Sequence, residues 1–144
     1  MNNDALIAHL ADTARKAART LTSSSYSERK AALLAIADAI ESRQSEIIEA
    51  NTEDMNRGKS NGLNSQLLDR LMLNESRIKG IAGGARKVAA LPDPLGNVLR
   101  ERTLENGLSL KQISVPFGVV GMVYEARPNV TVDAAVILLM SGNA

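Results

Sequence analysis

The stretch from Val115 to Asp133, VPFGVVGMVYEARPNVTVD, constrains the fold of this chain more than any other. Residues Val119 to Tyr124 form an apolar run rich in β-branched side chains, interrupted only by Gly121, which predicts a fully buried strand. The polar sequence EARPN follows, and Val130 to Met140 is nearly all apolar and long enough for a helix. This order is typical of α/β proteins, in which ligands collect beside the carboxyl end of a strand and the N-terminus of the next helix.

The polar turn is therefore the candidate functional site. Asn129 lies between two elements that are expected to be buried, where an amide is costly unless it is hydrogen-bonded or used. Thr131 or Asn129 is expected to cap the helix, and Asp133 falls in its first turn. An ordinary surface ion pair is the alternative interpretation of Glu125 and Arg127.

Composition limits the possible functions. The 17 basic and 16 acidic residues give a net charge of +1, which offers no electrostatic case for binding nucleic acid or an acidic membrane surface. Aromatic residues make up only 2% of the chain, so base-stacking platforms are not expected either. No apolar run reaches membrane-spanning length and no signal peptide is recognisable, so we expect a cytoplasmic protein. The absence of cysteine excludes disulfides and fits a reducing compartment.

The first two-thirds of the chain is expected to be helical. Ser25 and Glu28 fit a capping box, and Asn64 and Asn74 are expected to cap two later helices. Further helices are expected at 4–21 and 44–57, with a loop at 58–62. After Asn74 an apolar stripe at helical spacing indicates a buried face, and close helix packing is the expected reason for the glycines within it. The stripe comprises Ile78, Ile81, Ala82, Ala85, Val88 and Ala89, and the glycines are Gly80, Gly83 and Gly84.

A β-hairpin is expected next. Extended segments at 96–104 and 108–115 flank the turn Glu105–Gly107, and a bulge near Lys111 or Gln112 would explain a change in the alternation of apolar residues. Residues 134–140 are apolar on every side, and such a helix needs cover all round. We therefore expect the chain to be the front part of a longer protein.

These segments together resemble the gamma-glutamyl phosphate reductase (glutamate-5-semialdehyde dehydrogenase) family of the aldehyde dehydrogenase superfamily. The resemblance is carried by the run from Val115 to Asp133 with SGNA at 141–144, and it covers essentially the whole chain. Within the superfamily, the sequence EARPN is specific to this branch. The shorter segments ANTED, GL, LLDRL, RIKGI and LPDP also agree with the family.

The resemblance implies a fold class and a domain organisation. The expected class is α/β: N-terminal helices at 1–95 and an oligomerisation-type β-hairpin at 96–116 lead into a Rossmann-like NADP-binding domain of the aldehyde dehydrogenase fold. That domain begins at 117–144 and is incomplete in this chain. The implied reaction is the NADPH-dependent reduction of L-glutamyl 5-phosphate to L-glutamate 5-semialdehyde with release of phosphate, the second step of proline biosynthesis from glutamate.

The resemblance also implies roles for individual residues. Asn129 is the expected oxyanion donor, and the backbone from Val123 through Tyr124 and Glu125 to Ala126 is expected to line the nicotinamide end of the NADP(H) cleft. Our own further inference is that Arg127 binds a phosphate or carboxylate of the substrate, since a guanidinium matches such groups bidentately. Glu125 could serve only to hold Arg127 in place.

The family's cysteine nucleophile is absent, so we expect it beyond Ala144 and expect the chain alone to be inactive. A homo-oligomer and a partnership with glutamate 5-kinase are further expectations.

Two alternatives to this function remain open from the sequence. One is another acyl-reducing enzyme of the aldehyde dehydrogenase type, using a donor such as a CoA thioester. The other is a non-catalytic helical interaction module at 4–91.

Overall fold

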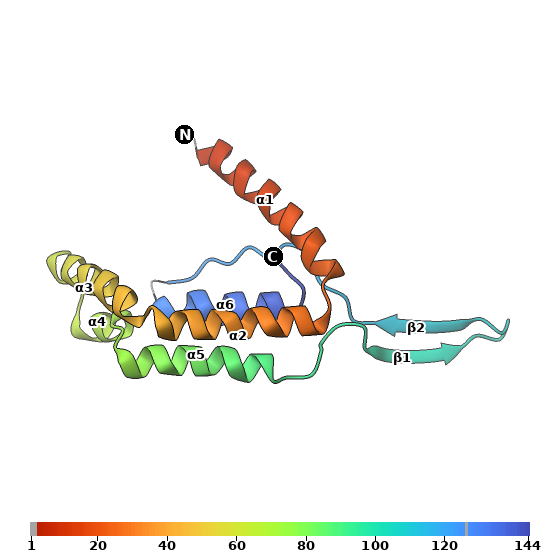
Figure 1. Cartoon of the computed structure of the whole chain (residues 1–144). Coiled ribbons are helices and arrows are strands. Elements are labelled where there is room, and N and C mark those ends of the chain that lie inside the picture. Colours follow the sequence, from red (N-terminus) through yellow and green to blue (C-terminus); the bar gives the residue numbers. More distant parts are fainter. Residues whose placement is uncertain (1–2, 126) are drawn as a thin grey trace.

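The structure, a computed structural model, describes residues 3–125 and 127–144. Helices α2, α5 and α6 lie side by side and form the body of the molecule, while α1 projects away from it (Figure 1). A two-stranded hairpin extends from one end, and α3 and α4 lie at the other. None of the described helices has the length and apolar character that crossing a membrane requires. The elements are α1 (Asn3–Ser23), α2 (Tyr26–Ser42), α3 (Gln44–Ser60), α4 (Ser65–Leu71), α5 (Glu75–Ala89), β1 (Val98–Thr103), β2 (Ser109–Ile113) and α6 (Pro128–Met140).

The predicted starts of α2, α4 and α5 are confirmed. At the start of α2, the Ser25 hydroxyl accepts from the Glu28 amide at 3.2 Å, and the Glu28 carboxylate accepts from the Ser25 amide at 2.7 Å. Hydrogen bonds from Ser25 hold the pKa of Glu28 below its usual value. Asn64 and Asn74 cap α4 and α5 by accepting amide hydrogen bonds at 2.9 Å. These caps satisfy amides that a helix start leaves without partners.

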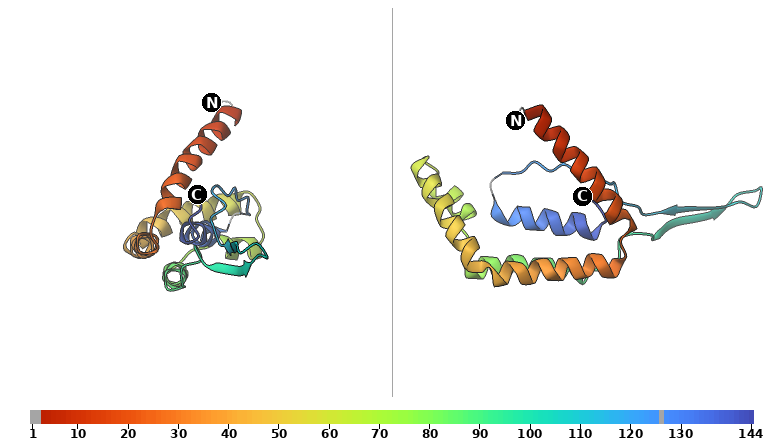
Figure 2. Two further views of the ribbon diagram at one scale, coloured as in Figure 1. Left: turned by 90° about the vertical axis from the view of Figure 1, so that its right-hand side faces the viewer. Right: turned by 45° about the horizontal axis from the view of Figure 1, so that its top comes forward.

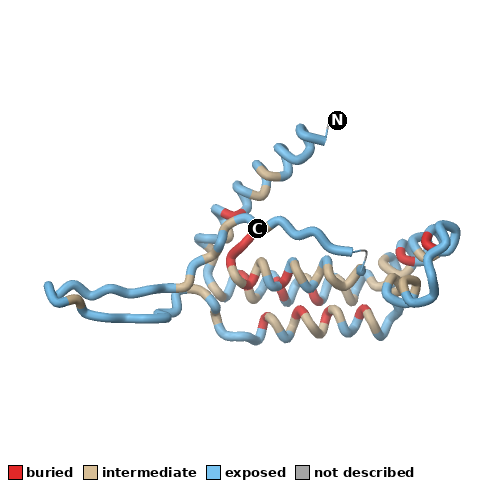
Figure 3. Tube along the Cα trace, turned by 180° about the vertical axis from the view of Figure 1, so that it is seen from behind, coloured by how far each residue is buried: buried red, intermediate tan, exposed pale blue. Residues whose placement is uncertain are grey.

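The core lies between α2, α5 and α6, where the buried residues are concentrated (Figure 3). The stripe expected on α5 is largely confirmed, and its alanines keep this helix close to α2. Fully burying a side chain such as Leu33 contributes about 1.5–3 kcal/mol. The buried cluster comprises Leu33, Ala37, Ala82, Ala85, Ala89, Val136 and Met140.

A buried guanidinium, that of Arg29, joins this core to the chain segments around it. Its side chain is only 3% exposed. It donates to the Met140 carbonyl at 3.2 Å, to the Ser24 carbonyl at 2.5 Å and to the Asp93 carboxylate at 2.7 Å. One side chain therefore holds together the end of α6, the α1–α2 connection and the loop that follows α5.

The strand predicted at 119–124 is not formed among the described residues. The segment is extended and passes over α6 without a neighbouring strand (Figure 2, right). Its Val123 side chain is fully exposed, because a buried strand needs partners that no described segment supplies. Only its beginning is paired. The Val120 amide donates to the Ala144 carbonyl and the Ala144 amide to the Gly118 carbonyl, both at 2.8 Å, which is the pattern of a parallel pair.

Two predicted helix boundaries are also wrong. Helix α6 begins at Pro128, and neither Asn129 nor Thr131 caps it. Proline suits the first helical position because its fixed φ is helical and its missing N–H needs no partner there. Helix α3 continues through Gly58, where a loop was expected. A Cβ on this glycine would lie 3.0 Å from a methyl carbon of Leu63, so glycine allows the following turn to pack against α3.

The glycines of α5 do not support the expected close packing. A Cβ on Gly80 or Gly83 would meet nothing within 4 Å among the described residues. At Gly84 the nearest atom would be an Asp133 carboxylate oxygen, at 4.0 Å, which is ordinary contact. Only Gly84 therefore faces another element.

The predicted hairpin is present, with its bulge on the other strand. Strands β1 and β2 are antiparallel, and the register shifts between Val98 and Arg100. The extra residue is therefore Leu99 on β1, between the pairs Val98–Ile113 and Arg100–Gln112. Both faces of the hairpin are exposed. At its base, Gly142 adopts a positive φ of 72°. A Cβ there would lie 2.9 Å from Leu95 and 3.0 Å from Pro116, the segments that lead into and out of the hairpin.

Replacing Arg29 by methionine is expected to lower the free energy of unfolding by about 3 kcal/mol, because the half-buried Asp93 carboxylate and two carbonyls lose their donor. Urea unfolding of the purified full-length protein measures this change. Arg57→Met is the matched control: its guanidinium pairs with Asp54 on the surface of α3, so the change should stay within about 0.5 kcal/mol. Equal losses in the two variants would contradict the role assigned to Arg29.

Candidate functional site

The start of α6 forms one wall of the candidate site. Pro128 begins the helix, and Arg127 precedes it in extended conformation. The half-buried Asn129 and the exposed Asp133 lie one turn apart on the same face of α6. The Asn129 amide donates to the Asp133 carboxylate at 2.9 Å. This bond uses one of the two N–H groups of the amide and fixes its orientation.

The opposite wall is the connection between α4 and α5. The buried Asn51 of α3 donates to the Leu71 carbonyl at 2.9 Å and accepts from the Leu73 amide at 2.7 Å. Arg77 of α5 donates to the Met72 carbonyl at 2.8 Å. Two side chains thus satisfy the backbone groups of a turn that has no regular structure of its own, which makes this wall rigid.

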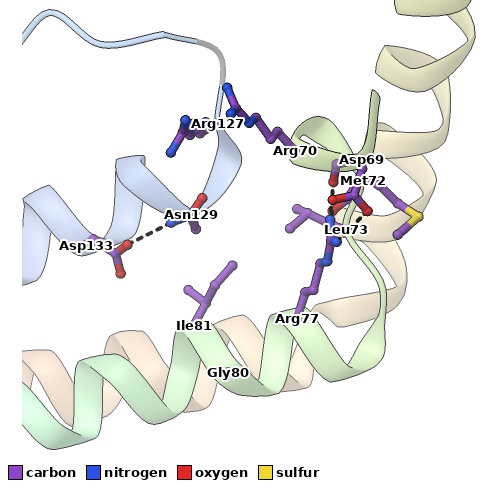
Figure 4. Close-up of a pocket in the computed structure, with 10 residues that line it drawn as sticks. All are labelled: Asp69, Arg70, Met72, Leu73, Arg77, Gly80, Ile81, Arg127, Asn129 and Asp133. Carbon is purple, nitrogen blue, oxygen red and sulfur yellow. Dashed lines mark hydrogen bonds and ion pairs between the residues drawn. The ribbon is translucent and has the colours of Figure 1, made fainter. Parts of the chain in front are cut away.

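A cleft of about 430 Å³ separates the two walls (Figure 4). Its position, at the N-terminus of α6, is the one that the sequence pattern predicted for a ligand. It is lined by Asp69, Arg70, Met72, Leu73, Arg77, Gly80, Ile81, Arg127, Asn129 and Asp133.

Three arginines give this cleft its electrostatic character. Arg77 is neutralised by an ion pair with Asp69 at 2.8 Å. Within the part of the chain that the structure describes, the guanidinium groups of Arg70 and Arg127 have no hydrogen-bond or ion-pair partner. The Asp133 carboxylate already accepts from Asn129. This bond from a neutral amide leaves the carboxylate charged, so the cleft offers two unpaired cationic groups against one anionic group. The excess of positive charge and the remaining Asn129 N–H suit anionic oxygens.

The structure brings together two of the residues singled out from the sequence, Arg127 and Asn129. No ion pair joins the Glu125 carboxylate to the Arg127 guanidinium, two described groups, so the surface-pair interpretation is not supported. Glu125 instead lines a smaller cavity of about 140 Å³ next to the cleft. Its carbonyl accepts from the Arg127 amide at 2.7 Å, which tightens the backbone before α6.

The other candidate residues lie on the extended segment. Val123 and Tyr124 are exposed, and the Tyr124 hydroxyl is 2.6 Å from the Thr131 hydroxyl oxygen in α6. Ala126 lies outside the described residues. Arg70, Arg77 and Asn51 were not assigned to the site from the sequence. They lie in the segments LLDRL, RIKGI and ANTED, which agree with the family, but nothing in these segments links them to the distant turn EARPN.

The proteins that this chain resembles are reductases. Two curated relatives are each named gamma-glutamyl phosphate reductase. The chain is 55% identical to the protein from Kineococcus radiotolerans and 53% identical to that from Moorella thermoacetica, over 131 residues in both cases. These residues are 91% of this chain but only 30% and 31% of the relatives, so the chain spans about a third of their length. No family model matches the chain.

Solved structures of the same name have the same fold. The gamma-glutamyl phosphate reductases of Thermotoga maritima and Saccharomyces cerevisiae each superpose with a TM-score of 0.89 at 36% sequence identity. The matches cover 93% and 94% of this chain, and 32% and 35% of those chains. The resemblance expected from the sequence is therefore confirmed over nearly all of the chain.

Replacing Asn51 by alanine in the full-length protein is expected to lower the free energy of unfolding by about 2 kcal/mol, since the half-buried Leu71 carbonyl and Leu73 amide lose their partner. Hydrogen exchange at the Leu73 amide should accelerate more than exchange in the core of α5. Asn56→Ala, an exposed change on the same helix, is the control and should alter neither. Unchanged protection of the Leu73 amide would show that Asn51 does not hold the wall.

Proposed function

We propose that this chain is part of an enzyme that reduces L-glutamyl 5-phosphate to L-glutamate 5-semialdehyde with NADPH and releases phosphate, in the biosynthesis of proline from glutamate. The observation that carries the proposal is the identity of 53–55%, over 91% of the chain, to proteins named for this activity. The arrangement of Asn129 and the arginines in one cleft supports it, because the substrate is an acyl phosphate with anionic groups at both ends.

Asn129 would donate a hydrogen bond to the oxygen of the acyl group as this oxygen becomes negative. A thiolate attacks the acyl carbon, the bond to phosphate breaks, and each tetrahedral intermediate carries an oxyanion. The amide is well suited to this role, because its bond to Asp133 holds one N–H and leaves the other for a ligand in the cleft. A preorganised donor of this kind contributes about 3 kcal/mol to the transition state.

The extended segment before α6 fits the nicotinamide end of a cofactor. Val123 and Tyr124 expose apolar surface, and their backbone groups have no hydrogen-bond partner among the described residues. These two residues, with Glu125 and Ala126, would hold the nicotinamide by apolar contact and by backbone hydrogen bonds. When bound, NADPH supplies the hydride that the reduction needs. The chain's own contribution is to orient the ring and keep water away from the reacting carbon.

Arg127 would bind an anionic group of the substrate. Its guanidinium lines the cleft beside Asn129 and has no partner among the described residues. A planar fork of donors is the best match for a carboxylate or phosphate.

The nucleophilic cysteine would come from outside these 144 residues, which contain none. The same proposal includes a cytoplasmic homo-oligomer that receives its labile substrate from glutamate 5-kinase.

Replacing Asn129 by alanine in the full-length enzyme is expected to lower kcat roughly 100-fold, because an oxyanion donor acts mainly in the transition state. The dissociation constant for NADPH, measured by fluorescence titration, should stay the same. Steady-state kinetics with Asn56→Ala as the control separates this effect from a general loss of folded enzyme. A kcat near that of the unaltered enzyme would refute the assignment.

The 144-residue chain expressed alone is expected to have no reductase activity and to be poorly folded or self-associated. It lacks the thiol that the reaction requires, and it exposes large apolar side chains on the 117–124 segment, with Phe117 93% exposed. NADPH oxidation assays and size-exclusion chromatography of the purified chain test the two halves of this expectation. Measurable reduction would remove the need for a cysteine, and a compact monomer would show that the chain covers its own core.

A further inference from the structure

Two arginines from distant parts of the chain meet at the candidate site. Arg70 belongs to α4, and Arg127 directly precedes α6. Both line the cleft of about 430 Å³, and both also line the adjoining cavity of about 140 Å³. They therefore stand at the boundary between the two spaces, and Figure 4 shows the Arg70 side chain extending toward Arg127.

No carboxylate among the described residues forms an ion pair with either arginine. Asp69 pairs with Arg77, and Asp133 accepts from Asn129. Glu125 lines the smaller cavity, yet its carboxylate lies beyond ion-pair distance of both guanidinium groups, all three being described. Two cations that share a cavity repel each other, and the repulsion disappears when an anion with several acceptor oxygens binds between them.

We propose that Arg70 and Arg127 form a two-arginine site that binds one oxyanion group of the substrate. The ligand group is a carboxylate or a phosphate, since either can accept from two guanidinium groups at once. The proposal rests on the proposed function, whose substrate carries an α-carboxylate and an acyl phosphate. Arg70 is thus a second substrate-binding residue, contributed by helix α4, which is far in sequence from the turn before α6.

The reverse reaction of the full-length enzyme distinguishes the two groups, because inorganic phosphate and the semialdehyde are then separate substrates. Arg70→Met is expected to raise the KM of one of them about tenfold while leaving the KM for NADP unchanged. A higher KM for phosphate assigns the site to the phosphoryl group, and a higher KM for the semialdehyde assigns it to the α-carboxylate. Arg70→Lys should show a smaller effect in the same direction, because lysine keeps the charge but not the fork.

Three further measurements make the test decisive. Arg57→Met, which removes an arginine far from the cleft, should change no KM by more than about twofold. If both arginines bind the same group, the double variant Arg70→Met/Arg127→Met should lose less than the product of the two single effects. Thermal unfolding should show that the variants remain folded. An unchanged KM for both substrates in a folded Arg70→Met enzyme would overturn the proposal.

Direct binding keeps the site testable apart from the reaction. Isothermal titration of the full-length protein with inorganic phosphate, and separately with L-glutamate, should show that Arg70→Met weakens one of them about tenfold. If Arg70→Met weakens the binding of phosphate or L-glutamate but the full-length protein does not reduce glutamyl phosphate, the proposed function is wrong and the two-arginine site is supported. If the enzyme is active but Arg70→Met weakens neither, the two-arginine site alone is wrong.

Discussion

The buried guanidinium of Arg29 is the interaction on which the arrangement of this chain depends. The last carbonyls of a helix have no partner within the helix and carry its negative end, so a cation beside them is stabilising. Arg29 donates to the Met140 carbonyl, at the last residue of α6, and to the Ser24 carbonyl, just after α1. The Asp93 carboxylate balances the buried charge. Three segments that are far apart in sequence are thereby fixed at one point.

The geometry of the cleft follows from this attachment. Arg29 holds the C-terminal end of α6, and the small side chains of α5 hold the helix body at a set distance from its neighbours. Asn129 and Asp133, at the other end of α6, must then face the turn that Asn51 and Arg77 make rigid. Arg29 and Asn51 do not line the cleft themselves but fix where the residues that line it lie, and such support is what a preorganised site requires.

Features that depend on neighbouring residues could be predicted from the sequence, and contacts between distant segments could not. Ser25 and Asn74 could be assigned because a cap depends on residues within one turn. The polar turn before α6 could be chosen as the candidate site because a polar segment between two apolar runs is visible in a single sequence. Arg70 could not be assigned to the site, since its neighbours in the sequence do not distinguish a surface arginine from one that faces another element. The strand at 119–124 was overestimated because an apolar β-branched run predicts pairing whether or not a partner is present.

The absence of a side chain at Gly142 has a mechanical consequence. Leu95 and Pro116 approach this residue so closely that a Cβ would act as a wedge between the body and both legs of the hairpin. Strands β1 and β2 are six and five residues long, and a strand advances about 3.3 Å per residue. A small shift of the chain next to Gly142 would therefore move the turn around Asn106, at the far end of the hairpin, by a larger distance. The direction of the hairpin therefore depends on residue 142 having no side chain, together with the hydrogen bonds that Asn97 and Ser114 donate to the Asp93 and Pro94 carbonyls at its base.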